Sequence, residues 1–387
     1  MTMKFQSFHK TISLSLAVLF AGSVFSSAQD ENVPFNLETI TVLETMPVKN
    51  QARTGTCWSF ATTSFIESEL IRMGKGHYDL SEMFFSRHAY ESKAELYVRY
   101  HSLTNFGPGG QAHDVMNVIR KYGFIPDAVY HGIHYGSEEH NHSELHTVLN
   151  HFLDGVLKAR QMTPVWDDAF RSILDTYYGE VPQSFEMKST TTTTVDFSES
   201  LGFNPDDYVE ITSYMRHPYY SQYVLEVPDN WSSDVYYNVP LDEFMEIIDH
   251  ALINGFTVAW DGDVSDRGFA SRDGLAIVPA KDWNDMSEEE RENVFKELPK
   301  EKKVDMEMRQ LAFDDFATTD DHLMHITGLF EAPDGRHFYL TKNSHGADRN
   351  DYGGFIYMSE AYVRLGTIAI MVHKDAIPET IMEKLGL

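Results

Sequence analysis

The sequence predicts an α+β chain, with a helix early in the chain and a β-hairpin near its end. An amphipathic segment that begins near Phe60 stops at Gly74, as a helix with a glycine cap does. Much later, the alternating run 322–330 is followed by the turn Pro333-Asp334-Gly335 and a second run, 338–342, a pattern typical of a hairpin. With 387 residues, of which 42% are hydrophobic, the chain is long enough to bury a large core.

The composition excludes several classes of partner. The chain has 31 Lys and Arg against 59 Asp and Glu, a formal net charge of -28. Such a charge repels phosphate backbones and anionic lipid surfaces, so nucleic acid is not an expected partner. Beyond the N-terminal stretch, no apolar run reaches the roughly 18 residues that a membrane span needs. Basic or neutral polypeptides are the better candidates.

The first 28 residues differ from the rest of the chain. Lys4 and Lys10 precede an apolar segment, 12–20, and small residues lead to Ala28. This arrangement predicts a signal peptide at 1–28, cleaved after Ala28, so that the mature protein is exported to the periplasm or secreted. The alternative is a buried N-terminal helix, which the short apolar segment disfavours. The mature chain would then span 29–387.

Cys57 is the only cysteine, so an internal disulfide is excluded. It is an inert buried thiol, half of an intermolecular bridge or a reactive group. The polar loop that begins at Gln51 places the thiol at the start of the amphipathic helix, where the helix dipole favours the thiolate. This position is typical of a nucleophile, and we expect the pKa of the Cys57 thiol to be lowered.

A thiol nucleophile also needs a proton acceptor and a group that orients the acceptor. His325 lies on the first strand of the predicted hairpin, and Asn343 follows the second strand. The hairpin can therefore bring the Asn343 amide beside the His325 imidazole and hold it in one tautomer. A buried histidine with a purely structural role is the alternative for His325.

These residues resemble the papain superfamily of cysteine peptidases, and specifically the bleomycin hydrolase / aminopeptidase C family. The resemblance covers Gln51 with the Cys57-Trp58 pair, the segment 325–328 and the segment 343–346. Further matches are Leu80-Ser81-Glu82, Gly109-Gly110-Gln111, the segment 121–126 and the segment 258–264. Together they cover most of residues 40–387.

The resemblance implies a papain-like fold, in which a helical half packs against an antiparallel, β-barrel-like half. His325 lies much farther from Cys57 than the roughly 130 to 150 residues of ordinary papain relatives. We therefore expect a helical and β insertion at about 131–250, followed after the catalytic segments by a C-terminal tail at about 378–387. In this family the insertion builds a hexameric ring, which makes a homo-oligomer the expected assembly. No metal and no cofactor is implied.

The family's roles carry over residue by residue. Cys57 would be the nucleophile, His325 the general base, Asn343 its orienting partner and Gln51 the oxyanion-hole amide. Peptide substrates would contact four further residues: Trp58, Gly109, Gly110 and Leu387, whose carboxylate would pair with a free amino terminus. The sequence departs from the family pattern at His345, where a tryptophan normally shields the Asn–His hydrogen bond.

The expected function is that of a cysteine aminopeptidase, which hydrolyses N-terminal residues from peptides through a Cys-His-Asn acyl-enzyme mechanism. One alternative is a papain-like endopeptidase with an open cleft, and another is a catalytically silent binding or assembly protein. The histidines between His131 and His151 could hold a metal, but a solvated loop that leads into a helix is the preferred interpretation. The run 190–194 is predicted to be a linker or an exposed strand, and 287–290 a capping box.

Overall fold

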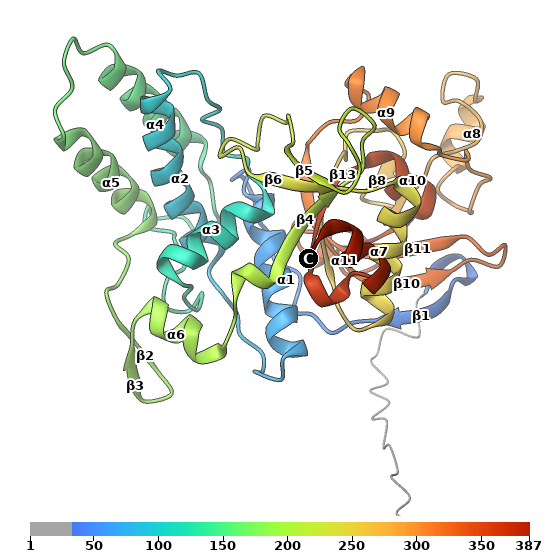
Figure 1. Cartoon of the computed structure of the whole chain (residues 1–387), viewed down its shortest axis with the longest axis horizontal. Coiled ribbons are helices and arrows are strands. Elements are labelled where there is room, and N and C mark those ends of the chain that lie inside the picture. Colours follow the sequence, from blue (N-terminus) through green and yellow to red (C-terminus); the bar gives the residue numbers. More distant parts are fainter. Residues whose placement is uncertain (1–32) are drawn as a thin grey trace, which may run out of the picture. The chain divides into compact units, whose positions relative to one another are not determined.

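The structure, a computed structural model, describes residues 33–387. The signal peptide predicted at 1–28 and its cleavage position lie outside the described residues. Phe35–Leu387 forms a compact unit. Within this unit helices from the first half of the chain gather on one side, and the main sheet, with the later helices around it, lies on the other, as Figure 1 shows.

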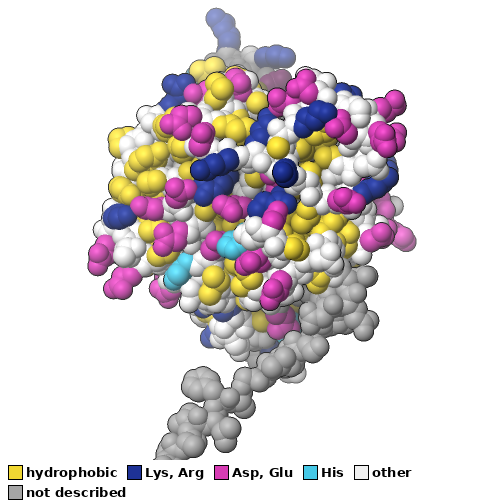
Figure 2. Space-filling view, turned by 90° about the vertical axis from the view of Figure 1, so that its right-hand side faces the viewer, with side chains coloured by type: hydrophobic (Ala, Val, Ile, Leu, Met, Phe, Trp, Pro, Cys, Tyr) yellow, Lys and Arg dark blue, Asp and Glu magenta, His cyan; other side chains and the backbone are white. Residues whose placement is uncertain are grey.

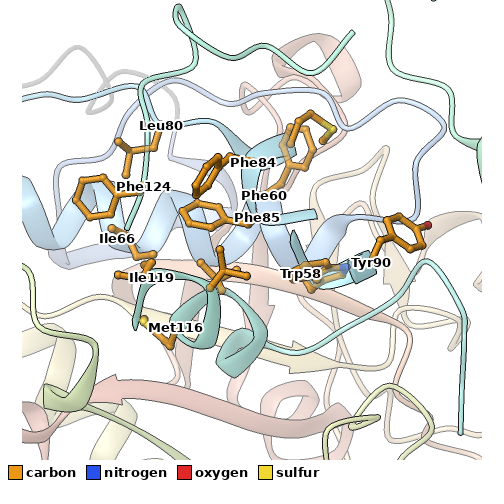
Figure 3. Close-up of a cluster of buried hydrophobic side chains, with 14 of the residues drawn as sticks. Trp58, Phe60, Ile66, Leu80, Phe84, Phe85, Tyr90, Met116, Ile119 and Phe124 are labelled. Atoms are coloured by element: carbon orange, nitrogen blue, oxygen red, sulfur yellow. The ribbon is translucent and has the colours of Figure 1, made fainter. Parts of the chain in front are cut away.

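The helical side surrounds one helix that is buried along most of its length. Its elements are α1 (Cys57–Arg72), α2 (Glu82–Arg99), α3 (Ala112–Tyr122), α4 (Ser143–Leu157), α5 (Val165–Tyr178) and α6 (Thr194–Leu201). Every residue of α1 from Cys57 to Leu70 is buried, because the helix packs against α2 and α3 on one side and against the sheet on the other. Figure 3 shows aromatic and aliphatic side chains of these helices meeting in the first core.

The other side is an eleven-stranded, mostly antiparallel sheet. Its strands are β1 (Glu38–Val42), β4 (Tyr208–Thr212), β5 (Ser221–Val224), β6 (Val235–Asn238), β7 (Val258–Gly262), β8 (Phe269–Ala270), β9 (Leu275–Ala276), β10 (His322–Glu331), β11 (His337–Lys342), β12 (Phe355–Ser359) and β13 (Thr367–His373). They lie in the order β5-β6-β4-β13-β7-β10-β11-β12-β9-β8, with β1 paired to β10. The predicted hairpin is confirmed as β10 and β11.

Further helices flank the sheet. They are α7 (Leu241–Ile253), α8 (Glu288–Asn293), α9 (Met306–Asp314), α10 (Glu360–Gly366) and α11 (Glu379–Leu385), with short 3-10 turns at Pro34–Asn36, Pro205–Asp207, Ala347–Arg349 and Lys374–Ala376. Residues of α7, α10 and α11 form a second core with β7 and β10, in which Trp260 is fully buried. The capping box predicted at 287–290 is confirmed at the start of α8.

The range 131–250, expected to be an insertion, contributes to both sides. Helices α4 and α5 pack on the helical side, and a separate hairpin of β2 (Phe185–Met187) and β3 (Thr190–Thr192) forms the exposed strand predicted for the threonine run. However, β4 pairs with β13 inside the main sheet. The later part of the range is therefore integral to the sheet.

Charged side chains of both signs are scattered over the face seen in Figure 2, with apolar side chains between them. In residues 33–387 no helix is both long and apolar enough to cross a membrane.

Candidate active site

Cys57 is the first residue of α1, and a tightly organised loop leads into it. The Thr54 hydroxyl donates to the Gln51 carbonyl at 2.9 Å, and the hydroxyls of Thr54 and Thr56 lie 2.6 Å apart. Gly55 has φ +65°, and a side chain there would collide with Pro108. The loop therefore fixes where the helix begins, and with it the position of the thiol.

The Cys57 thiol is buried, and its pKa is raised to about 12. Burial is the largest cause, a hydrogen bond from the Leu323 backbone acts in the opposite direction, and nearby aspartates raise the pKa further. The lowering expected from the helix dipole is thus wrong for the resting site, because loss of water contact outweighs the dipole. The resting sulfur is a neutral thiol.

Asn343 forms its side-chain hydrogen bond with His322. Nε2 of His322 lies 2.8 Å from Oδ1 of Asn343. The same oxygen accepts a bond from the Ser344 backbone N–H at 2.7 Å, which identifies it as the amide oxygen. Nε2 must therefore carry the proton, and Nδ1 of His322 keeps its lone pair. Burial lowers the pKa of His322 to about 4, so the ring is a neutral base at physiological pH.

His345 stacks on His322. The two ring centroids are 5.1 Å apart and the planes differ by only 10°. The backbone of His345 bridges to Asn50, next to Gln51, which ties this loop to the segment that precedes Cys57. His345 thus covers the His322 ring at the position where the family carries tryptophan.

The expected pairing of Asn343 with His325 is wrong. His325 is fully buried, and its Nδ1 lies 3.0 Å from the Ser64 hydroxyl on α1. Burial, together with the charge of Lys342, holds the pKa of His325 well below its usual range. His325 is therefore a neutral core histidine. This matches the alternative interpretation of His325 as a buried histidine with a structural role.

The register of the hairpin explains the difference. His325 stands directly opposite Lys342, so the two side chains share one face, and Lys342 Nζ also donates to Ser64 at 2.8 Å. Because side chains alternate along a strand, the next residue, Asn343, leaves that face. His322, three residues before His325, leaves it for the same reason. The sequence showed both histidines in one strand but not which one would face Asn343.

Gln51, expected to be the oxyanion-hole amide, is bound to the loop that follows Asn343. Its Oε1 accepts a hydrogen bond from the Ser344 hydroxyl at 2.6 Å, and its backbone N–H donates to the Ser344 carbonyl at 2.9 Å. No described residue accepts a hydrogen bond from its Nε2, so this donor is available to a substrate. The structure thus joins Gln51, through Ser344, to Asn343 and His322.

The residues expected to bind substrate have mainly supporting roles. Trp58 is 1% exposed, and its Nε1 donates to the Pro108 carbonyl at 3.0 Å. A side chain on Gly110 would collide with the Asp114 carboxylate and crowd the Trp58 ring, and one on Gly109 would collide with the Asp229 carboxylate. The direct substrate contact expected for Trp58 is therefore wrong, because the ring is covered by the loop that it supports.

Lys93 on α2, which no sequence motif marked, binds the same loop through its ammonium group. Its ammonium is buried and donates to the backbone carbonyls of Gly107, at 3.0 Å, and Gly109. It also lies 5.9 Å from the Trp58 ring centroid.

Leu387, expected to bind the amino terminus of a substrate, does not lie at the Cys57 site. Helix α11 continues to Leu385, and the Leu387 N–H donates back to the Met382 carbonyl at 3.2 Å. Leu387 lines a pocket with Tyr208, Glu210 and Lys374, which includes none of the residues of the Cys57 site. We expected an extended tail in the cleft. Because residues 379–385 form helix α11, only Gly386 and Leu387 follow it, and two residues are too few for such a tail.

The histidines of the range 131–151 form no metal site in the described residues, where no group of three or more suitable ligands occurs. His142 is buried beside Tyr178, and burial lowers its pKa to about 3. It is a neutral packing residue.

A buried thiol at a helix N-terminus, a histidine–asparagine pair on the facing sheet and a glutamine in the preceding loop define a papain-like cysteine peptidase. The chain belongs to the Peptidase C1-like family, whose model matches residues 172–386.

Two relatives match nearly the whole chain. Aminopeptidase G from Lactobacillus delbrueckii subsp. lactis is 22% identical over 94% of this chain and 89% of its own length. The crystal structure of PepW from Lactobacillus rhamnosis HN001 superposes with a TM-score of 0.70 at 19% identity and covers 90% of this chain and 84% of that chain. These comparisons confirm the papain superfamily and the α+β fold expected from the sequence.

Proposed function

We propose that the chain is a cysteine aminopeptidase, which removes N-terminal residues from peptides through an acyl-enzyme. The family match and the similarity to a protein named aminopeptidase G support this activity. The observation that carries the proposal is the 2.8 Å bond from His322 Nε2 to Asn343 Oδ1, because it leaves Nδ1 as the free base.

In the proposed mechanism the Cys57 sulfur attacks the scissile carbonyl carbon while its proton passes to Nδ1 of His322. Because the thiol pKa is raised and the imidazole pKa is lowered, the resting pair is neutral, and proton transfer accompanies attack. The Gln51 amide and the Cys57 backbone N–H stabilise the oxyanion.

His322 then gives the proton to the leaving amine as the C–N bond breaks. A water molecule next loses a proton to His322 and attacks the thioester carbonyl; the C–S bond breaks, the N-terminal residue leaves as its acid, and His322 returns the proton to the sulfur. Throughout the cycle Asn343 accepts the Nε2–H bond and keeps the ring in place.

The identity of the base is tested by the same substitution at two histidines. We expect His322→Gln to lower kcat by about 10²- to 10⁴-fold, the usual contribution of a general base. His325→Gln, which can keep a hydrogen bond to Ser64, should stay within a few-fold of the wild type. Steady-state kinetics on an aminoacyl-coumarin substrate measure both, and thermal melting checks that both variants fold. If His325→Gln lowered kcat more than His322→Gln, His325 would be the general base.

The two alternative functions predict different results. An endopeptidase with an open cleft would cleave N-blocked peptides as well as free ones. A silent binding protein would not react with an epoxide-type thiol inhibitor at Cys57. Peptide mapping after inhibitor treatment, together with hydrolysis of paired free and N-acetylated peptides, distinguishes all three.

The assembly is also a proposal. The family resemblance favours a homo-oligomeric ring, and light scattering of the purified protein would give the number of chains. A single-chain mass would contradict it.

A further inference from the structure

Three aspartates from separate segments lie near the Cys57 thiol. Asp229 is in the loop between β5 and β6, Asp261 is on β7, and Asp320 precedes β10. Each is close enough for its negative charge to raise the pKa of the thiol. The mechanism proposed above uses none of them.

Asp261 is the most deeply buried of the three, at 3% exposed. It stands opposite Leu323, the residue whose backbone hydrogen-bonds to the thiol. Its neighbour Trp260 packs into the second core, and Ala259 packs into the first core, which contains α1. Because side chains alternate along a strand, Asp261 lies on the same face of β7 as Ala259, the face toward α1. Neither of its oxygens has a described residue within good hydrogen-bond geometry, although the Asp320 carboxyl and the Gln111 amide lie close enough to affect its pKa. A buried carboxylate without a donor is costly and points to a missing ligand.

Asp320 forms a pair with Asp261. The Gln111 side-chain amide donates to Asp320 at 2.9 Å. Burial raises the pKa of both carboxyls, and that of Asp261 is raised further by the charge of Asp320. The two carboxyls therefore bind a proton more readily than two separate carboxyls would. No lysine or arginine of residues 33–387 forms an ion pair with either member.

Asp229 differs because it already has partners. The Asn105 amide donates to it at 2.8 Å, and the charge of Lys93 counteracts the pKa rise that burial imposes on it. It lies directly against Gly109, at the wall of the site. The uncompensated charge beside the thiol thus belongs to Asp261 and Asp320.

We propose that the Asp261–Asp320 pair binds the free α-ammonium group of a peptide substrate and so restricts cleavage to the first peptide bond. The inference rests on the proposed aminopeptidase function. An ammonium supplies up to three donors and one positive charge, which match the unpartnered oxygens and the uncompensated charge. An N-acetyl group would instead direct a neutral amide and a carbonyl oxygen at carboxylates.

The test compares substrates that share the same aminoacyl-coumarin bond but carry an α-amino, an α-hydroxy or an N-acetylamino group. We expect the wild type to prefer the free amine. Asp261→Asn should lower kcat/KM for the free amine by about 10- to 100-fold, the range for a lost hydrogen bond to a charged group. Its kcat/KM for the N-acetyl substrate should be unchanged or higher, and Cys57 should still react with the epoxide inhibitor. Asp168→Asn, the same change on the exposed surface of α5, is the matched control.

Asp320→Asn provides a second variant and should also lose preference for the free amine. Deletion of Gly386–Leu387 should leave the preference intact, and loss of it there would show that the tail is the anchor and overturn the inference. If Asp261→Asn and Asp320→Asn both retained the preference, the acidic pair would not bind the ammonium.

A wild type that cleaves N-acetyl and free substrates equally would refute the proposed aminopeptidase function itself. Should neither variant fold, the wild type still decides, because equal rates for α-hydroxy and α-amino substrates would exclude an anionic anchor.

Discussion

His345 stacks on His322 at a position where the family carries a larger, apolar ring. The stack shields the Nε2–Oδ1 bond, and burial holds the pKa of His322 at about 4, with a further lowering from the charge of His345 and an opposite effect from Asp321. Since the base must be neutral, activity should persist as the pH falls and decline only as it approaches 4. The ordinary histidine value of 6.5 would place that decline far higher.

We predict that His345→Ala shifts the acid limb of kcat/KM upward, toward 6.5. The variant exposes the His322 ring to water and removes a neighbouring positive charge, and both changes raise the pKa of His322. Rates on a free-amine substrate between pH 3.5 and 8 measure the shift. His131→Ala, which alters an exposed histidine, should leave the limb in place. A wild-type limb already near 6.5 would contradict the burial argument.

The individual site residues were predictable to different degrees. The place of Cys57 at a helix start and of Asn343 after a hairpin strand followed from local sequence signals, whereas Gln51 was assigned through the family resemblance alone. The base was missed because His322 and His325 lie on one strand, and only the cross-strand register decides which face each occupies. Asp261 lies in the segment 258–264 that resembles the family, but it was assigned no role, because its pairing with Asp320, 59 residues away in sequence, is a property of the fold.

At the scale of elements, one buried lysine joins helix α2 to the glycine loop of the active site. Burial lowers the pKa of Lys93, while the charges of Asp114 and Asp229 act in the opposite direction. Replacing it with an apolar residue would leave the carbonyls of Gly107 and Gly109 without this donor and would remove a buried positive charge near Asp114 and Asp229. Such losses typically cost about 3 kcal/mol of folding free energy.

Lys93→Met should therefore lower the free energy of unfolding by about 3 kcal/mol, measured by urea titration. It should also reduce kcat/KM more than it slows inhibitor labelling of Cys57, because the loop rather than the thiol is displaced. Lys188→Met removes a charge from the exposed β2–β3 turn and should change neither quantity. Equal stability of the Lys93→Met protein would show that the loop holds its shape without the ammonium.

At the scale of the whole molecule, the sequence predicted where the insertion lies but not how it joins the rest of the fold. The range 131–250 was identified by its length, and α4 and α5 do lie on the helical side. Its later part nevertheless supplies β4 to the central sheet and Asp229 to the surroundings of the Cys57 thiol. Sequence distance alone cannot reveal this, because strand partners in a large sheet are set by packing and not by order along the chain.

We also propose that the protein is exported, and the proposed cleavage can be tested because it lies before the compact unit begins at Phe35. Cleavage after Ala28 would remove no residue of Phe35–Leu387. We therefore expect the protein recovered outside the cytoplasm to begin at Gln29 and to have the same kcat/KM as the uncleaved chain. Ala28→Tyr, which puts a bulky residue where the processing enzyme accepts a small one, should accumulate the longer form. N-terminal sequencing distinguishes the two forms, and a native protein that keeps Met1 and remains in the cytoplasm would refute export while leaving the catalytic proposal untouched.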